Sequence, residues 1–243
     1  MREFELLEIV EEMFGKENID VPAGKHDAAF LSFCGKYLVV SCDTVNEVTD
    51  FPKFMKPEEF GKMAVAVTLS DLAGSGAKPI VFLSSISMKN ADKELFRKIM
   101  LGIKEWANKF GVKVAGGDID FAPILTIAGF AVGRAERIIT RSGAKPGDKV
   151  FVTDTLGKAQ LCLDLLEKGY ERKDLPFAEK LYTPEPRIAE GLRIAEFANS
   201  LTDISDSLAI SANLVANASN VKIVLEKKNL PLENLLDFVN EEK

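Results

Sequence analysis

The sequence is poor in the residues on which many catalytic and metal sites depend. Among 243 residues it has one histidine, His26, and three widely spaced cysteines, Cys34, Cys42 and Cys162. A single histidine argues against a Ser-His-Asp triad and against a zinc site built from several imidazoles. The cysteines are odd in number and form no C-x-x-C pair, which argues against a disulfide framework and favours a reducing cytoplasm.

Several sequence signatures are also missing. There is no G-x-x-x-x-G-K-[ST] segment, because Gly157-Lys158 is followed by Ala159, and there is no G-x-G-x-x-G or G-x-S-x-G motif. No apolar run approaches the ~18 residues that a membrane span needs, and the N-terminus is acidic rather than basic. We therefore expect a soluble protein that is neither exported nor a P-loop enzyme.

The charge balance bears on possible partners. The net charge is −6 and the pI is about 5.1. A negative chain repels phosphate backbones and anionic lipid surfaces, so neither nucleic acid nor a membrane is an expected partner. A nucleotide remains compatible with this charge if metal ions or backbone N–H groups offset the repulsion of its phosphates.

The rest of the composition is ordinary for a compact globular chain, with 47% hydrophobic and 28% charged residues. Periodicity predicts a helix over residues 3–14, a helix that starts at Pro57 and ends at the glycines Gly74 and Gly76, and a helix over 92–110 capped by Asp92. Strands are predicted over 37–42, 80–88, 112–115 and 124–132. The order predicts an α/β or α+β sheet layered with helices.

A second unit is predicted after the turn-rich segment 142–148, which is the best candidate boundary. Strands are expected over residues 150–153 and 221–225. Helices are expected over 158–168, 188–198, 208–218 and 232–239, with a proline-interrupted segment at 182–187. No repeat of 20 to 50 residues is present, so a solenoid or propeller is excluded.

Aspartates recur where apolar segments break. They are Asp27, Asp43, Asp71, Asp118, Asp203 and Asp206. If the fold gathers several of them, their repulsion must be offset by cations, and hard oxygen ligands suit Mg²⁺. The simpler interpretation is that each aspartate caps a helix or turn, and for any one of them we rate that as the commoner role. The glycines before Asp118 allow close approach of the backbone to a phosphate, although a plain tight turn explains them equally well.

The aspartates lie within segments that together resemble one family. The segments are 27–29 (DAA), 41–47 (SCDTVNE), 69–79 (LSDLAGSGAKP), 116–118 (GGD), 141–148 (RSGAKPGD), 186–187 (PR) and 203–206 (DISD). In this order they resemble the thiamine-monophosphate kinase family. That family shares a superfamily with aminoimidazole ribonucleotide synthetase, selenophosphate synthetase and a hydrogenase-maturation enzyme.

The resemblance implies a two-domain, synthetase-like fold. Residues 1–134 would form an N-terminal domain, a mixed sheet layered with helices, which binds ATP and metal and pairs with a second copy as a dimeric β-barrel. Residues 135–243 would form a smaller C-terminal α/β domain. The partners implied are ATP, several Mg²⁺ ions, thiamine monophosphate and a second copy of the chain.

The resemblance also implies roles for individual residues. The implied metal ligands are Asp27, Ser41, Asp43, Asp71, Asp118, Asp203 and Asp206, with Cys42 contributing through its backbone. ATP would face Gly117, Asp118, Arg141 and Ser205. Asp206 and Arg141 would act in catalysis, and Asp50 stands where the family has a histidine that contacts substrate.

The implied reaction passes the terminal phosphoryl group of ATP directly to the phosphate of thiamine monophosphate. The acceptor oxygen is already ionised, so no strong general base is required. Arg141 would neutralise negative charge of the phosphates. Without the family resemblance, a surface cation in a basic linker explains Arg141 equally well.

The chain also departs from the family pattern. His26 replaces an acid and is expected at the surface or in a cap, Asp50 replaces the histidine, and Ser207 replaces a glycine. The family pattern continues beyond Lys243 with an acidic segment and an aromatic contact, so part of the acceptor pocket is expected to be missing. Two alternatives therefore stay open: a relative that uses the same ATP site on another acceptor, and a non-catalytic nucleotide-binding dimer.

Overall fold

A computed structural model describes residues 3–232 of the chain. Its first half contains one five-stranded mixed sheet in the order β1-β2-β5-β3-β4. The strands are β1 (Ala29–Phe33), β2 (Lys36–Asn46), β3 (Lys78–Met88), β4 (Lys113–Phe121) and β5 (Thr126–Ala135). Only the β3–β4 pair is parallel, and the sheet does not close on itself within one chain.

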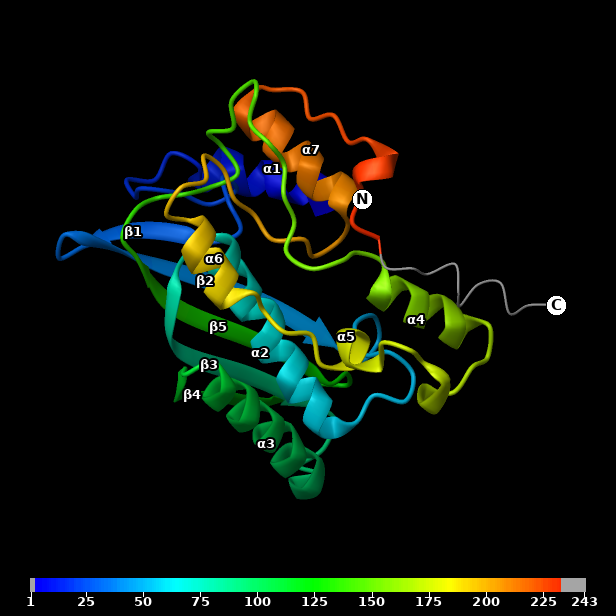
Figure 1. The fold of residues 1–243 in the computed structure, drawn as a ribbon. Coiled ribbons are helices and arrows are strands. Elements are labelled where there is room, and N and C mark those ends of the chain that lie inside the picture. The colour runs from blue at the N-terminus through cyan, green and yellow to red at the C-terminus, as the bar shows by residue number, and fades with distance from the viewer. Residues whose placement is uncertain (1–2, 233–243) are drawn as a thin grey trace.

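Helices α2 (Pro57–Gly74) and α3 (Lys93–Lys109) cover one face of this sheet (Figure 1). Pro57 at the first turn and Glu59 at the third helical position start α2, and Asp92 accepts hydrogen bonds from the backbone N–H groups of Glu94 and Leu95 at the start of α3. The main core lies between these helices and the sheet and includes the fully buried Phe30 and Phe82.

The opposite face of the sheet is open in the single chain. Val40, Ile119 and Phe130 are exposed, and Cys42 pairs across β2 and β5 with Phe130. Alternation along the strands places Val40, Cys42 and Phe130 on this face, away from α2. A sheet face with several exposed apolar side chains is a candidate interaction surface.

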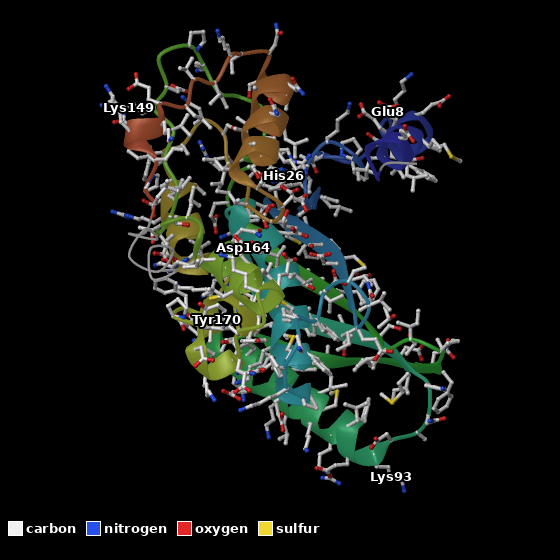
Figure 2. The ribbon with its side chains drawn as sticks, turned by 90° about the vertical axis from the view of Figure 1, so that its right-hand side faces the viewer. Glu8, His26, Lys93, Lys149, Asp164 and Tyr170 are labelled. Carbon is white, nitrogen blue, oxygen red and sulfur yellow. The ribbon has the colours of Figure 1, made fainter. Side chains whose placement is uncertain are left out.

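Residues 136–232 are mostly helices and loops. The helices are α4 (Lys158–Glu167), α5 (Ala178–Tyr182), α6 (Ile188–Ile194) and α7 (Leu208–Ser219), with 3₁₀ turns η1 (Arg172–Asp174) and η2 (Lys227–Asn229). A small second core of Leu161, Cys162, Leu165, Leu181 and Tyr182 joins α4 to α5. Helix α1 (Glu3–Phe14), marked by the label of Glu8 in Figure 2, stands apart from the sheet.

Most predicted elements of the first half are confirmed. Strands β2, β4 and β5 extend three to six residues further toward the C-terminus than predicted, whereas β4 and β5 begin one and two residues later. The short strand β1 was missed. The strands predicted over 150–153 and 221–225 are wrong, because these segments have no strand partner among the described residues and remain irregular. Helix α6 ends at Ile194 rather than 198. The helix predicted over 232–239 lies, apart from Leu232, outside the described residues.

Candidate functional site

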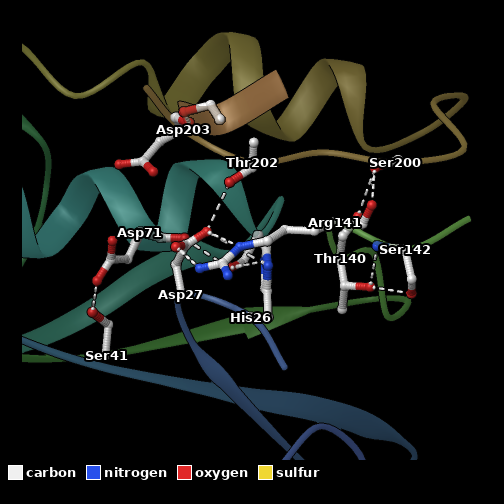
Figure 3. A network of polar contacts seen from close by, with 12 residues as sticks. His26, Asp27, Ser41, Asp71, Thr140, Arg141, Ser142, Ser200, Thr202 and Asp203 are labelled. Carbon is white, nitrogen blue, oxygen red and sulfur yellow. Dashed lines mark hydrogen bonds and ion pairs between the residues drawn. The ribbon is translucent and has the colours of Figure 1, made fainter. Parts of the chain in front are cut away.

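Three of the predicted aspartates converge. One carboxylate oxygen each of Asp27, Asp71 and Asp203 lies within 4.8 Å of the other two. Asp27 precedes β1, Asp71 lies in the last turn of α2, and Asp203 comes from the loop before α7 (Figure 3). Gly74 makes this approach possible, because a Cβ there would lie 2.7 Å from the backbone nitrogen of Asp203.

Each carboxylate of this three-acid cluster is held by one hydroxyl group. Ser41 donates to Asp71, Ser70 donates to Asp203 at 2.6 Å, and Thr202 donates to Asp27 at 2.9 Å. Ser41 was predicted as a site residue, whereas Ser70 and Thr202 were missed. The signal that could have found them is their position, because each directly precedes one of the clustered acids in the sequence.

The cluster has one cation. Arg141 donates from Nη2 to Oδ1 of Asp27, and its Nε lies 3.4 Å from Oδ2. Both side chains are largely buried, at 16% and 18% exposed. Burial alone would raise the pKa of Asp27, but hydrogen bonds from Arg141 and Thr202 and the charge of Arg141 hold it below its ordinary value. The backbone carbonyl of Arg141 is itself fixed by the hydroxyls of Ser200 and Ser219.

No such cation pairs with the other two acids in the described part of the chain. Burial, with the charges of the neighbouring Asp203, Asp43 and Asp27, raises the pKa of Asp71 to about 8 despite the opposing hydrogen bond from Ser41. Burial and the neighbouring acids likewise raise the pKa of Asp203. Like charges held this close favour either protonation or a bound cation. Asp43, on the α2 face of β2, is near enough to contribute to both shifts.

His26 lies inside the molecule beside this cluster, so the prediction of a surface or capping histidine is wrong. Its side chain is 0% exposed, and its Nε2 lies 3.0 Å from the hydroxyl of Ser75. Burial lowers the pKa of His26 to about 4, so the imidazole is neutral near pH 7.

The remaining predicted residues lie elsewhere. Asp43 and Ser84 share one row of the sheet across Gly129, and Gly117 continues this row on β4, three strands from β2. Asp118 pairs with Ser85 and, by alternation, points to the open face. Within one chain Gly117 and Asp118 are therefore not brought to the three-acid cluster.

Other predicted residues are placed near but outside the cluster. Ser205 and Asp206 are exposed in the loop before α7. Cys42 is exposed on the open face of the sheet. Asp50 accepts hydrogen bonds from the backbone and side-chain amides of Asn46 and so closes the turn after β2. Ser207 caps α7 by accepting from the backbone N–H of Ile210.

Comparison with known proteins places these observations in a family context. Residues 25–135 match the family model "AIR synthase related protein, N-terminal domain". The thiamine-monophosphate kinase of Archaeoglobus fulgidus is 58% identical over 242 residues, which cover 98% of this chain and 81% of the relative. That of Pyrococcus horikoshii is 39% identical over 235 residues, covering 96% and 74%.

Solved structures agree with the sequence relatives. The structure described as "AaThiL complexed with AMPPCP and TMP" superposes with a TM-score of 0.89 at 31% identity, covering 98% of this chain and 78% of that one. The thiamine monophosphate kinase of Aquifex aeolicus gives 0.85 at 30% identity, covering 98% and 80%. A hydrogenase maturation protein, HypE, solved with ATP, shares the fold at 19% identity, with a TM-score of 0.68 over 87% of this chain and 64% of that one.

Proposed function

The chain belongs to the thiamine-monophosphate kinase family, and from that membership we propose that it transfers the terminal phosphoryl group of ATP to thiamine monophosphate, giving thiamine diphosphate and ADP. The observation that carries the proposal is the convergence of Asp27, Asp71 and Asp203 beside Arg141. Phosphoryl transfer needs alignment and charge neutralisation more than covalent help from the protein. Clustered acids that hold cations, next to a guanidinium, would suit that requirement.

We assign Mg²⁺ to the three-acid cluster. The donors are carboxylate oxygens, the ligands that Mg²⁺ prefers, and the raised pKa values of Asp71 and Asp203 indicate charge that a cation would offset. Bound Mg²⁺ would supply charge neutralisation at the phosphates. Asp43 and Ser41 border the same space from β2 and complete the proposed ligand set in one chain, with Cys42 contributing its backbone.

Arg141 is proposed to exchange partners when ATP binds. It now pairs with Asp27, whose carboxylate is also a proposed metal ligand. A guanidinium pairs equally well with phosphate oxygens, so release from Asp27 would free both the acid for metal and the cation for the nucleotide. Ser205 and Asp206 are proposed to approach the nucleotide from the exposed loop before α7, and Asp50 to lie at the acceptor end of the site.

We propose that the enzyme is a homodimer formed through the open face of the sheet, with 1–134 and 135–243 as its domains. The exposed apolar residues on that face support this assignment. Gly117 and Asp118 lie on the edge strand β4, away from the acids of their own chain. We therefore propose that they serve the nucleotide in the dimer, where an edge strand meets the partner.

Mixing two inactive variants tests this dimer assignment. Asp71→Asn and Asp118→Asn chains are unfolded, mixed and refolded together. Recovery of kinase activity in the mixture, but in neither variant alone, supports a site shared between copies. No recovery, with mixed dimers verified by mass spectrometry, contradicts it.

The described residues contain no helix long and apolar enough to cross a bilayer. We propose a cytoplasmic location on other grounds, namely three cysteines that are all unpaired and a reaction that consumes ATP.

The activity itself is tested by incubating the protein with ATP, Mg²⁺ and thiamine monophosphate. We expect equal amounts of thiamine diphosphate and ADP, and no product when EDTA removes the metal. ADP without thiamine diphosphate would indicate another acceptor. Neither product, with nucleotide still bound, would indicate the non-catalytic alternative.

A further inference from the structure

His26 has one ring nitrogen with a partner and one without. Nε2 lies 3.0 Å from Ser75 Oγ, while Nδ1 is the one buried side-chain nitrogen or oxygen, in the part of the chain that the structure describes, without a hydrogen-bond partner. A buried polar atom left without a partner destabilises the folded state, so its surroundings require an explanation.

The acceptor that Nδ1 faces is Asp27. The distance from Nδ1 to Oδ2 of Asp27 is 3.6 Å, slightly beyond a hydrogen bond (Figure 3). Phe30 packs near the ring with a centroid distance of 6.1 Å, and no group of the described residues makes a hydrogen bond with Nδ1. A shift of well under 1 Å would bring Nδ1 and the carboxylate into hydrogen-bond contact.

The hydrogen-bond inventory then decides which nitrogen carries the hydrogen. Neutral imidazole has one N–H group and one lone pair, whereas an ionised carboxylate only accepts. A hydrogen on Nδ1 therefore suits Asp27, and a lone pair there would face the carboxylate charge. The Ser75 hydroxyl lies within reach of both Nε2 and the carbonyl of Asp71, at 2.7 Å, and its one hydrogen can serve either acceptor.

We infer that neutral His26 carries its hydrogen on Nδ1 and is a positioning residue that holds the Asp27 carboxylate toward Asp71 and Asp203. Its role toward a metal rests on the proposed function; the Nδ1–H contact itself does not. In this tautomer the Ser75 hydroxyl, which lies 2.7 Å from the carbonyl of Asp71, turns its hydrogen toward Nε2 instead. When Arg141 leaves Asp27 for a phosphate, His26 and Thr202 remain as donors that keep Asp27 in place. Removal of such a donor behind a metal ligand typically weakens metal binding 10- to 100-fold.

The tautomer can be measured directly because His26 is the only histidine in the chain. We expect ¹⁵N NMR of the ligand-free protein at pH 7 to show Nδ1 as the protonated, pyrrole-type nitrogen and Nε2 as the pyridine-type nitrogen. A protonated Nε2 would overturn the inference. This measurement needs no metal, nucleotide or activity, so it stands even if the chain is not a kinase.

Two variants separate the two ends of the ring. His26→Asn keeps a donor near the position of Nδ1 and loses the contact with Ser75, whereas His26→Gln keeps a group near Nε2 and loses the donor to Asp27. We expect calorimetry to show Mg²⁺ affinity nearly unchanged in His26→Asn and about 10-fold weaker in His26→Gln. In steady-state assays the same difference should appear in the Mg²⁺ concentration for half-maximal rate.

Equal Mg²⁺ affinity in the two variants, or a weaker affinity in His26→Asn than in His26→Gln, would overturn the positioning role. Thermal melting verifies that both variants are folded, and if either is not, the NMR measurement on the unmodified chain decides. Absence of Mg²⁺ binding to the unmodified protein would instead contradict the proposed metal site while leaving the assignment of the Nδ1 hydrogen to be judged by its own spectrum.

Discussion

The two halves of the described chain differ in how they are built, although both contribute to one site. Residues 29–135 form a sheet and two long helices around a continuous core, which holds nearly all of the largest fully buried side chains. Residues 136–232 form short helices and loops around a small cluster of which only Tyr182 is both large and fully buried. The first half positions Asp71 on a rigid helix, and the second supplies Arg141, Thr202 and Asp203 from loops. The site thus draws its acids from both halves, and its guanidinium and one hydroxyl from loops of the second, where binding residues are commonly found.

The halves meet through a few polar contacts and through limited apolar packing, in which Ile188 lies against the main core and Met55 against the second cluster. Arg172 pairs with Glu59 and lies over the ring of Tyr182, whose hydroxyl donates to the backbone of Lys53. Gly191 of α6 approaches the carbonyl of Ala73 so closely that a Cβ would lie 2.2 Å from it. The second half is thus held at both ends of α2, and the contact of Gly191 lies close to Asp71.

The acid that belongs to the rigid half should matter most. Asp71→Asn is expected to lower kcat by on the order of 10³-fold, because a metal ligand contributes several kcal/mol of charge stabilisation. The fold should persist, since the change also removes a like charge from the cluster. Rate measurements under saturating substrate and Mg²⁺ test this, with Asp164→Asn on the exposed face of α4 as the matched control. An active Asp71→Asn enzyme would remove the main support for the kinase site.

The difference between the two cores can be measured by truncating one residue in each. Phe82→Ala should cost about 3 to 5 kcal/mol of unfolding free energy, because the ring is fully buried in the main core. Leu165→Ala in the second cluster should cost less, near the ~2 kcal/mol lower limit for such changes, because the cluster is smaller and can relax. Urea titrations give both values. Equal costs would mean that the second half is as tightly packed as the first.

The same difference explains how far the sequence could predict the fold. Helix α3, with its Asp92 cap and long apolar stripe, and the long strands β2 and β3 were predicted, because local pattern and burial agree there. The segments 150–153 and 221–225 also carry β-favouring residues, yet no neighbouring strand pairs with them among the described residues. Strand propensity is realised only where a partner strand is present.

The site was predictable in residue type but not in geometry. The positions of the aspartates at the ends of apolar segments indicated a cluster, and three of them meet. Whether Asp118 joins them depends on its place on edge strand β4, where a register irregularity near Phe82 and Leu83 precedes it. The burial of His26 depends on packing against Ser75 and Phe30, which lie far from each other in the sequence.

The pH dependence of stability should reveal the uncompensated acids. The raised pKa of Asp71 means that the folded protein binds a proton that the unfolded chain has lost, so stability falls as pH rises toward about 8. The lowered pKa of His26 acts in the opposite sense between about 4 and 6.5, where stability rises with pH. The pKa of Asp203 is also raised, so this residue lowers stability with rising pH in the same way as Asp71.

The net expectation is a loss of up to about 2 kcal/mol between pH 6.5 and pH 8 in the metal-free protein. Urea unfolding at the two pH values, with EDTA present, measures it. Asp71→Asn should remove most of the loss, and saturating Mg²⁺ should stabilise the protein more at pH 8 than at pH 6.5. A stability that rises over this interval would contradict the assigned state of the cluster.

The smallest expected effect concerns a surface contact that joins the halves. Lys109 of α3 pairs with Glu185 at 2.6 Å, but both side chains are 40% or more exposed. Exposed pairs contribute about 0 to 1 kcal/mol, so Glu185→Gln should change the free energy of unfolding by less than about 1 kcal/mol. The indole N–H of Trp106, which donates to the carbonyl of Pro184 at 3.2 Å, remains to hold the same segment. Urea titration at low and at high salt is the measurement, with Glu167→Gln on α4 as control. A cost above 2 kcal/mol that salt does not reduce would show that the docking of the second half depends on this ion pair.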